Sequence, residues 1–154
     1  MKVNIQLFED GLLPCKATDN ACCYDVFARE MTYVNTNYVI VKIGFAMSFP
    51  KNYKLVLVPR SNITKSGWFV PNSPGQGDSD YYNEYEIRFR ALPNGIKFNW
   101  DKFKFELTYP EFPYKLHHRV GQIYLAKVND IEFETVQEIK KSTNRTGGFG
   151  STGK

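Results

Sequence analysis

The stretch GQGDSDYYNEYEIRFRA, residues 75–91, joins a glycine- and aspartate-rich segment to an alternating one. In its second half, Tyr85, Ile87, Phe89 and Ala91 alternate with charged side chains. A period of two predicts a β-strand with one buried face and one polar face. The first half has two glycines one residue apart, which favours a sharp turn or the tip of a hairpin. The stretch therefore predicts β-structure that presents a functional loop.

The same alternation recurs in short runs on both sides of this stretch. The further strands that it predicts lie at residues 3–7, around 25, and at 39–45, 55–57, 103–107 and 123–127. A helical period is sustained nowhere, and the sequence predicts only a short helix that Ser61 caps and Gly67 ends. With 154 residues, 42% hydrophobic and 16% aromatic, the chain is expected to form one all-β domain, a sandwich or a barrel.

The amino-acid composition limits the kinds of ligand and the cellular compartment that we expect for this protein. The net charge of +4 is mild and the basic residues are dispersed, so we expect a small polyanion as ligand and no direct nucleic-acid binding. Three cysteines, with Cys22 and Cys23 adjacent, do not suit a secreted disulfide framework and favour a reducing cytoplasm. His117 and His118 are adjacent, which argues against a zinc site, and we interpret them as surface residues. The sequence predicts neither a membrane span nor a signal peptide, and thus a soluble protein.

The loop at residues 75–81 is the first candidate site. Asp78, Asp80 and Tyr81 place two carboxylates and an aromatic ring beside the backbone of Gly75. In a regular strand Asp78 and Tyr81 would point to opposite faces, so both reach one ligand only from a turn or a hairpin tip. Either carboxylate could act as a base. The alternative interpretation is an exposed acidic turn between two strands.

Two further positions suit a phosphate ligand. Arg60 and Ser61 stand at the start of the expected short helix, where free backbone N–H groups, a hydroxyl and a guanidinium would converge. The alternative for this pair is an ordinary capped helix.

Asp25 stands among apolar neighbours, which is unusual for a carboxylate, although capping of a turn would also explain it.

The chain ends in a glycine-rich tail, residues 142–154, which reads STNRTGGFGSTGK. Such a composition is typical of a flexible linker, but the single Phe149 at its centre is not. Ordering the tail costs about 1 to 2 kcal/mol per residue. We therefore expect it to close only over a ligand whose phosphates meet backbone N–H groups and whose ring stacks on Phe149.

These motifs together resemble the trimeric dUTP diphosphatases, or dUTPases, over essentially the whole chain. The most specific match is the tail segment GGFGSTG at residues 147–153. The other matches are Pro59-Arg60-Ser61, the pair Asp78 and Tyr81, the pair Arg119 and Gln122, and Asn72 six residues before Asp78. The resemblance implies a distorted jelly-roll β-domain at residues 1–141, with a long connection at 93–117. It also implies that residues 142–154 form a mobile lid over a neighbouring subunit's site.

The resemblance implies an activity and a role for single residues. The activity is Mg²⁺-dependent hydrolysis of dUTP to dUMP and diphosphate, in a homotrimer whose sites are each assembled from three chains. Asp78 would deprotonate the water that attacks the α-phosphorus, Tyr81 would pack under the deoxyribose, and Asp25 would reach the metal through water. The implied substrate-binding residues are Arg60, Ser61, Asn72, Gly75, Tyr81, Gln122, Arg145, Phe149, Gly150, Ser151 and Thr152.

The sequence departs from the family pattern at several positions. Cys22-Cys23 stand where the family has Ala-Gly, Gly77 where it has Ile, and Arg145 one position after its usual arginine. The connection at 93–117 is also longer than usual. Two alternatives belong to other classes: a dCTP deaminase of the same fold, which lacks this tail, and a dUTPase-like binding or regulatory protein that uses 93–117 as its contact surface.

Overall fold

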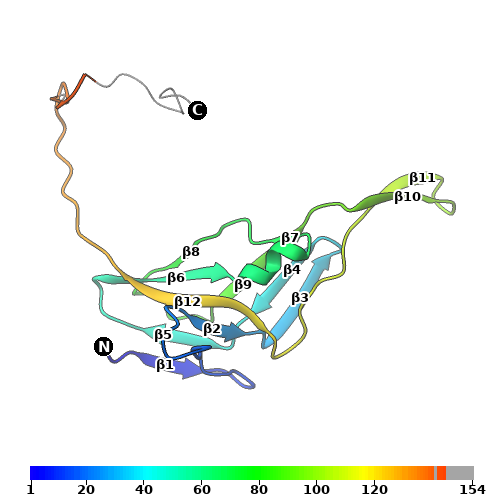
Figure 1. Ribbon diagram of the computed structural model, residues 1–154, viewed down its shortest axis with the longest axis horizontal. Coiled ribbons are helices and arrows are strands. Elements are labelled where there is room, and N and C mark those ends of the chain that lie inside the picture. The colour runs from blue at the N-terminus through cyan, green and yellow to red at the C-terminus, as the bar shows by residue number, and fades with distance from the viewer. Residues whose placement is uncertain (141, 145–154) are drawn as a thin grey trace.

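A computed structural model describes residues 1–140 and 142–144, and in them the chain forms short antiparallel strands and one turn of 3-10 helix (Figure 1). The elements are β1 (Asn4–Leu7), β2 (Tyr24–Phe27), β3 (Glu30–Asn35), β4 (Tyr38–Lys42), β5 (Phe45–Ser48), β6 (Tyr53–Pro59), η1 (Ser61–Lys65), β7 (Trp68–Phe69), β8 (Gly75–Gly77), β9 (Glu86–Ala91), β10 (Gly95–Asn99), β11 (Lys104–Thr108) and β12 (Arg119–Lys127).

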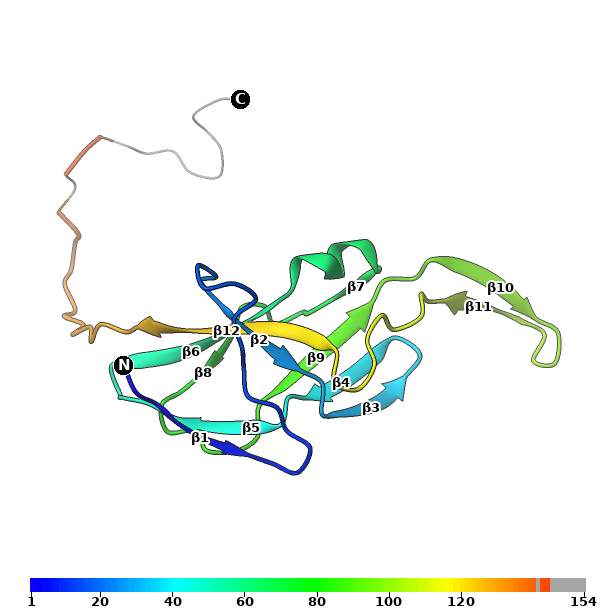
Figure 2. The ribbon, with the colours of Figure 1, turned by 60° about the horizontal axis from the view of Figure 1, so that its bottom comes forward.

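Two four-stranded sheets make the body of the molecule, with the orders β2-β12-β6-β8 and β3-β4-β9-β7. A further pair, β1-β5, lies below them in Figure 2. Strand β12 pairs with β2 on one side and with β6 on the other, and its register with β6 runs from Gly121 opposite Pro59 to Lys127 opposite Tyr53. The alternating runs predict a sandwich or a barrel, and the structure is a β-sandwich, in agreement with the jelly-roll domain that the resemblance implies.

One hydrophobic cluster fills the space between the sheets. Phe45 and Phe89 are fully buried, and the Phe89 ring lies 5.2 Å from that of Phe112 and 5.7 Å from that of Tyr114. Phe112 and Tyr114 come from the proline-broken segment after β11, which thus closes one end of the core although it has no regular structure. The apolar positions of the alternating runs supply most of the cluster, as their period predicts.

The structure corrects two of the local expectations. The run at 39–45 is not one strand, because Gly44 adopts φ +79° and divides it into β4 and β5. Nor is Ser61 a helix cap: Arg60 occupies the N-cap position of η1, no side chain caps its end, and the turn is 3-10. Strand β3 was not expected, since it is largely exposed and lacks a clear apolar alternation. Strand β10 was not expected either, although Ile96 and Phe98 alternate with polar residues in it.

Two segments extend away from the sandwich in different directions. The hairpin of β10 and β11, with its flanking turns, forms a long arm, which we define as residues 93–108 (Figures 1 and 2). Residues 128–140 leave the end of β12 on the opposite side of the body. Within the described part of the chain, no helix has the length and apolarity that crossing a membrane requires. The boundary that we predict near residue 141 stays a prediction.

Replacement of Phe89 by Ala should destabilise the protein strongly. Its side chain is fully buried against two aromatic rings, so the variant loses burial and leaves a cavity, at a cost of about 3 to 5 kcal/mol. Leu92→Ala is the control, because Leu92 is 61% exposed and its truncation should change the free energy of unfolding by less than about 1 kcal/mol. Urea unfolding measures both. Equal losses in the two variants would contradict this description of the core.

Candidate active site

A buried carboxylate lies where strands β2, β12 and β6 meet. The Asp25 side chain is 1% exposed, and it is the one buried charged side chain among the described residues. Its Oδ1 accepts a hydrogen bond of 3.0 Å from Gln122 Nε2 and lies 3.3 Å from Arg60 Nε. Its Oδ2 lies 3.3 Å from Arg119 Nη1 and has no hydrogen-bond partner among the described residues. We call Asp25, Arg60, Arg119 and Gln122 the Asp25 clamp.

The clamp arises from strand register. Gln122 stands opposite Asp25 in β2 and opposite Val58 in β6, so the amide and the carboxylate share one face of the sheet. Arg60 follows the last residue of β6, and Arg119 is the first residue of β12. Both guanidinium groups therefore reach Asp25 from strand ends. A buried carboxylate needs such partners, because an unpaired charge is strongly unfavourable away from water.

Beside the clamp is a polar hollow of about 330 Å³. Its lining comprises Phe27, Arg60, Asn62, Pro113, Tyr114, His117, His118 and Arg119. The Arg60 and Arg119 side chains are 31% and 44% exposed, so each guanidinium can touch Asp25 and still reach a ligand. Ser61 is exposed next to Arg60. Two guanidinium groups with histidines beside them suit an anionic ligand with several oxygens, such as a phosphate chain.

A second, smaller hollow lies under β8. It has a volume of about 90 Å³, and we call it the β8 slot; its lining is Leu55, Leu57, Val70, Asn72, Gly75, Gln76, Gly77, Tyr85, Glu86 and Ile87. Asn72 approaches Gly75, whose hypothetical Cβ would lie 4.0 Å from Asn72 Nδ2. At Gly77 a Cβ would lie only 2.7 Å from the Tyr85 ring, so no side chain fits there. Gly77, which departs from the family pattern, is thus required by the close approach of Tyr85.

The two glycines form an extended strand, not the turn that we expected from their spacing. Gly75 to Gly77 constitute β8, and the turn follows at Asp78, where the Tyr81 N–H donates to the Asp78 carbonyl at 3.2 Å. Asp78, Asp80 and Tyr81 are all exposed. Asp78 and Tyr81 thus lie in a turn and not in a strand, as both must if they are to reach one ligand.

The turn is fixed to the body at its far end. Tyr81 Oη donates to the Glu84 carbonyl at 3.2 Å. The Glu84 carboxylate accepts two hydrogen bonds from Arg29, at 2.8 and 2.9 Å, and one from the Gly44 N–H at 2.9 Å. The Tyr81 ring also lies 5.1 Å from that of Tyr85. These contacts limit the positions that Asp78 and Tyr81 can take.

Within one chain the clamp and the slot lie apart. Gly77 pairs with Leu55 near the start of β6, whereas Arg60 follows its end, so Asp78 lies roughly 16 to 20 Å along the sheet from Arg60. Gln122 pairs with Val58 and Gly75 pairs with Leu57, and successive residues of a strand point to opposite faces. The structure brings Asp25, Arg60 and Gln122 together, and separately Asn72, Gly75, Asp78 and Tyr81.

The predicted site residues and the observed ones differ in two ways. Arg145, Phe149, Gly150, Ser151 and Thr152 lie outside the described residues. Arg119, which matched a motif without a role, belongs to the clamp, and Asn62, His117 and His118 line the hollow. The feature of the sequence that could have identified these three residues is their position close to Arg60 or Arg119 in the chain. In the described part of the chain, no three His, Cys, Asp or Glu side chains converge to hold a metal.

Comparisons with known proteins identify the family. No protein-family model matches the chain. The deoxyuridine 5′-triphosphate nucleotidohydrolase of Hydrogenobaculum sp. is 31% identical, over 96% of this chain and 94% of its own length. That of Helicobacter pylori is 30% identical, over 99% and 97%. The chain belongs to the dUTPase family. It is therefore a member of an enzyme family, as its motifs predict.

Solved structures of dUTPases share the fold. The dUTPase of Staphylococcus bacteriophage 80alpha, with bound dUPNHPP, superposes with a TM-score of 0.78 at 19% identity and covers 99% of this chain and 98% of its own. A mutant dUTPase of phage phi11 of S. aureus gives a TM-score of 0.70 at 18% identity, over 92% of this chain and 100% of its own. The likeness extends over the β-sandwich, which is thus a dUTPase fold.

Tyr85, the residue that supports the slot, should make stability depend on alkaline pH. Burial, with smaller contributions from Tyr81 and Asp78, raises the pKa of Tyr85 to about 12. This pKa exceeds the ordinary phenol value of about 10, so the folded protein keeps Tyr85 neutral at pH values where the unfolded chain loses the proton. The resulting contribution to the free energy of unfolding is complete below pH 10 and is lost as the pH rises to 12. The free energy of unfolding should fall by about 2 to 3 kcal/mol more in the wild type than in Tyr85→Phe over this range. Parallel curves from urea unfolding would contradict this.

Proposed function

We propose that this chain hydrolyses dUTP to dUMP and diphosphate by attack of water on the α-phosphorus. The observation that carries the proposal is the pairing of two unlike sites in a member of the dUTPase family. One is the β8 slot, which adjoins an exposed aspartate and tyrosine, and the other is a cationic hollow. A deoxynucleoside triphosphate has the matching parts, a flat base, a sugar and a chain of phosphates.

The β8 slot is the proposed site of the uracil ring. Leu55, Leu57 and Ile87 provide apolar walls, while the Asn72 amide and the backbone of Gly75 can donate to and accept from the ring edge. Cytosine presents the opposite donor and acceptor pattern at that edge. It would leave buried backbone groups unpaired, and such mismatches can cost up to about 10,000-fold in kcat/KM.

Asp78 is the proposed general base and Tyr81 the proposed support of the deoxyribose. Asp78 begins the turn directly after β8, so its carboxylate stands next to a base held in the slot. A carboxylate at that position can take a proton from the attacking water. The Tyr81 ring is held by its own hydroxyl and by Tyr85, and a ring under the sugar would leave no room for a ribose 2′-hydroxyl.

The hollow beside the clamp is the proposed site of the phosphates. Arg60 and Arg119 would each form charge-assisted hydrogen bonds with phosphate oxygens, and Ser61 would add a hydroxyl. Gln122 would contribute from beside Asp25, to which it already donates one hydrogen bond. We further propose that the tail residues Arg145, Phe149, Gly150, Ser151 and Thr152 close over the base and the distal phosphates.

Mg²⁺ is the proposed metal, and it would arrive with the triphosphate. This ion binds mainly through phosphate oxygens and keeps most of its waters, so it needs few ligands from the protein. When bound, it would neutralise charge on the phosphates. Asp25 is flanked by two guanidinium groups, so direct coordination is unfavourable. Its Oδ2 has no hydrogen-bond partner in the part of the chain that the structure describes, and it could still accept a hydrogen bond from a metal-bound water.

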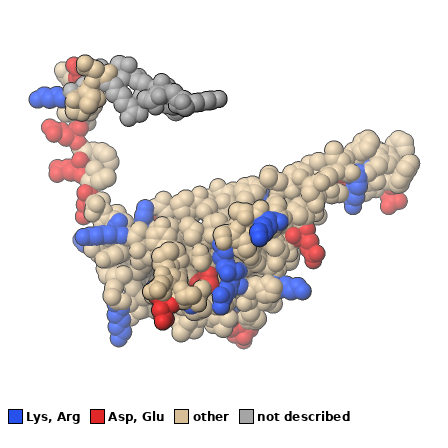
Figure 3. Space-filling model, in the orientation of Figure 1, with Lys and Arg blue, Asp and Glu red and all other residues tan. Residues whose placement is uncertain are grey.

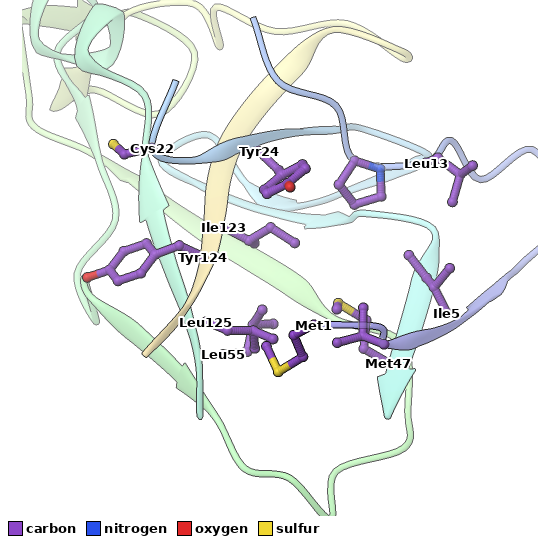
Figure 4. Close-up of a pocket in the computed structure, with 12 residues that line it drawn as sticks. Met1, Ile5, Leu13, Cys22, Tyr24, Met47, Leu55, Ile123, Tyr124 and Leu125 are labelled. Atoms are coloured by element: carbon purple, nitrogen blue, oxygen red, sulfur yellow. The ribbon is translucent and has the colours of Figure 1, made fainter. Parts of the chain in front are cut away.

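A homotrimer with shared sites is the proposed assembly. The clamp and the β8 slot point to opposite faces of one sheet, so a single nucleotide cannot contact both in one chain. The body also has an uncovered apolar hollow of about 490 Å³, lined in part by Ile5, Met47, Leu55 and Leu125 (Figure 4). After β12, apolar side chains that include Phe133, 89% exposed, extend from the body. Contacts with neighbouring subunits would cover both surfaces.

Replacement of Asp78 by Asn tests the chemistry. The variant keeps the shape of the turn and loses the base, so turnover should fall by about 100- to 10,000-fold while dUTP binding is largely retained. Asp80→Asn is the matched control and should remain active. The measurement is diphosphate release from dUTP, dCTP, dTTP and UTP, with binding by calorimetry. Comparable kcat/KM for dUTP and dCTP in the wild type, or a dead Asp80→Asn beside an active Asp78→Asn, would refute the proposal.

Mixing of two inactive variants tests the shared site. Asp78→Asn has an intact clamp, and Arg60→Ala has an intact slot and turn. If each site takes its clamp from one chain and its turn from another, random exchange in a 1:1 mixture should restore about a quarter of the sites. Mass spectrometry of differently tagged subunits confirms the exchange. A mixture that has exchanged and stays inactive would show that both parts come from one chain.

A further inference from the structure

The 93–108 arm is an amphipathic two-stranded ribbon that nothing in the proposed reaction uses. Its register pairs Ile96 with Leu107 and Phe98 with Phe105, so these four side chains share one face. The Phe98 ring lies 4.8 Å from that of Trp100 and 5.4 Å from that of Phe103, which extends the same apolar surface to the tip. We call these six side chains the arm face.

The arm face is exposed to an unusual extent. The exposed fractions are 68% for Ile96, 78% for Trp100, 79% for Phe103, 75% for Phe105 and 52% for Leu107. With about 200 Å² for each aromatic side chain, the three exposed rings alone present roughly 450 Å², and the aliphatic pair raises this to roughly 600 Å². That equals the upper end of the largest apolar patch on a typical monomer. An isolated two-stranded hairpin is also marginally stable in water, so a second layer would stabilise the arm.

The charged side chains of strands β10 and β11 lie on the other face of the arm. Lys97 pairs with Glu106 across the strands, and Asn99 with Lys104. Glu106 accepts from Asn99 Nδ2 at 3.1 Å and lies 3.5 Å from Lys102 Nζ and 3.6 Å from Lys104 Nζ. On the side seen in Figure 3 the arm is mostly uncharged surface. The arm face thus offers no electrostatic attraction to an acidic protein or to a nucleic acid.

The tip also disfavours a lipid surface as the partner. Asp101 stands between Trp100 and Phe103 in the connecting turn, so its carboxylate would have to leave water as the rings insert. The arm face therefore suits a flat, uncharged, apolar protein surface of similar size. The same face on a second copy of this chain has these properties.

The geometry points to an arm-to-arm contact, in which the arm face packs against the arm face of a second copy of this chain. Two such faces would bury about 1,200 Å² in total, the lower limit for a stable interface. Two ribbons stacked face to face form a small β-sandwich with Lys97, Lys104 and Glu106 still in water. The contact is isologous, since each copy contributes the same residues. It lies on the opposite side of the body from residues 128–140 (Figures 1 and 2), and so joins subunits independently of the proposed trimer.

A double variant, Phe103→Glu with Phe105→Glu, tests the contact. Both rings are exposed, so the body should fold normally, but four like charges would face each other across the interface. Light scattering between about 1 and 100 µM should give a wild-type mass that doubles with concentration and a variant mass that does not. The matched control is Lys97→Ser with Lys104→Ser, on the other face, which should associate as the wild type does. Equal masses for the wild type and the Phe103/Phe105 variant across this range would overturn the inference.

Trp100 fluorescence provides a test in the unaltered protein. Trp100 is 78% exposed in the single chain and would be covered by the contact, while Trp68 is 4% exposed in either state. Dilution should therefore shift the emission to longer wavelength over the range in which the mass halves. Emission that does not change with concentration contradicts the contact. Flotation with phosphatidylcholine or phosphatidylserine vesicles that is lost in the Phe103/Phe105 variant would assign the face to lipid, and would also overturn it.

Discussion

A carboxylate that is removed from water must be matched by donors and cations, and much of the body is arranged around this constraint at Asp25. Asp25 belongs to β2, and its partners come from two other places: Gln122 and Arg119 from β12, and Arg60 from just after the end of β6. The loss of one partner would leave a charge that the interior cannot solvate, at a cost of several kcal/mol. The burial of Asp25 therefore depends on the register of these strands and on the positions of both guanidinium groups.

The same arrangement separates the two halves of the proposed site. A strand presents alternate residues to opposite faces, and β6 pairs with the clamp strand on one edge and with β8 on the other. The clamp therefore cannot face the slot beside Asp78 in the same chain. Under the proposed assignment of the base to the slot and the phosphates to the hollow, a second copy of the chain would have to provide one of the two parts. The proposed trimer would then be a condition of the proposed reaction.

The sequence predicted those features whose cause is local. Alternation identified β1, β6, β9, β11 and much of β12, because a half-buried strand requires it. It could not reveal that Gly77 is needed for the approach of Tyr85, since that contact joins two elements in space. Arg119 had no role for a similar reason: only the pairing of β12 with β2 brings it to Asp25. Exposed strands such as β3 lack the burial that creates a readable pattern.

The arm shows a different limit of sequence patterns. The alternation of Ile96, Phe98, Phe105 and Leu107 is that of a strand with one buried face, and read alone it places these residues in the core of the domain. The structure keeps the alternation, but none of the residues that it describes covers this face. Such a pattern indicates that one face of the strand is suited to burial, but it does not identify the surface that buries it. When the body of the same chain provides no cover, the pattern itself becomes evidence for a partner, and the absence of charge from the face restricts that partner to an apolar protein surface.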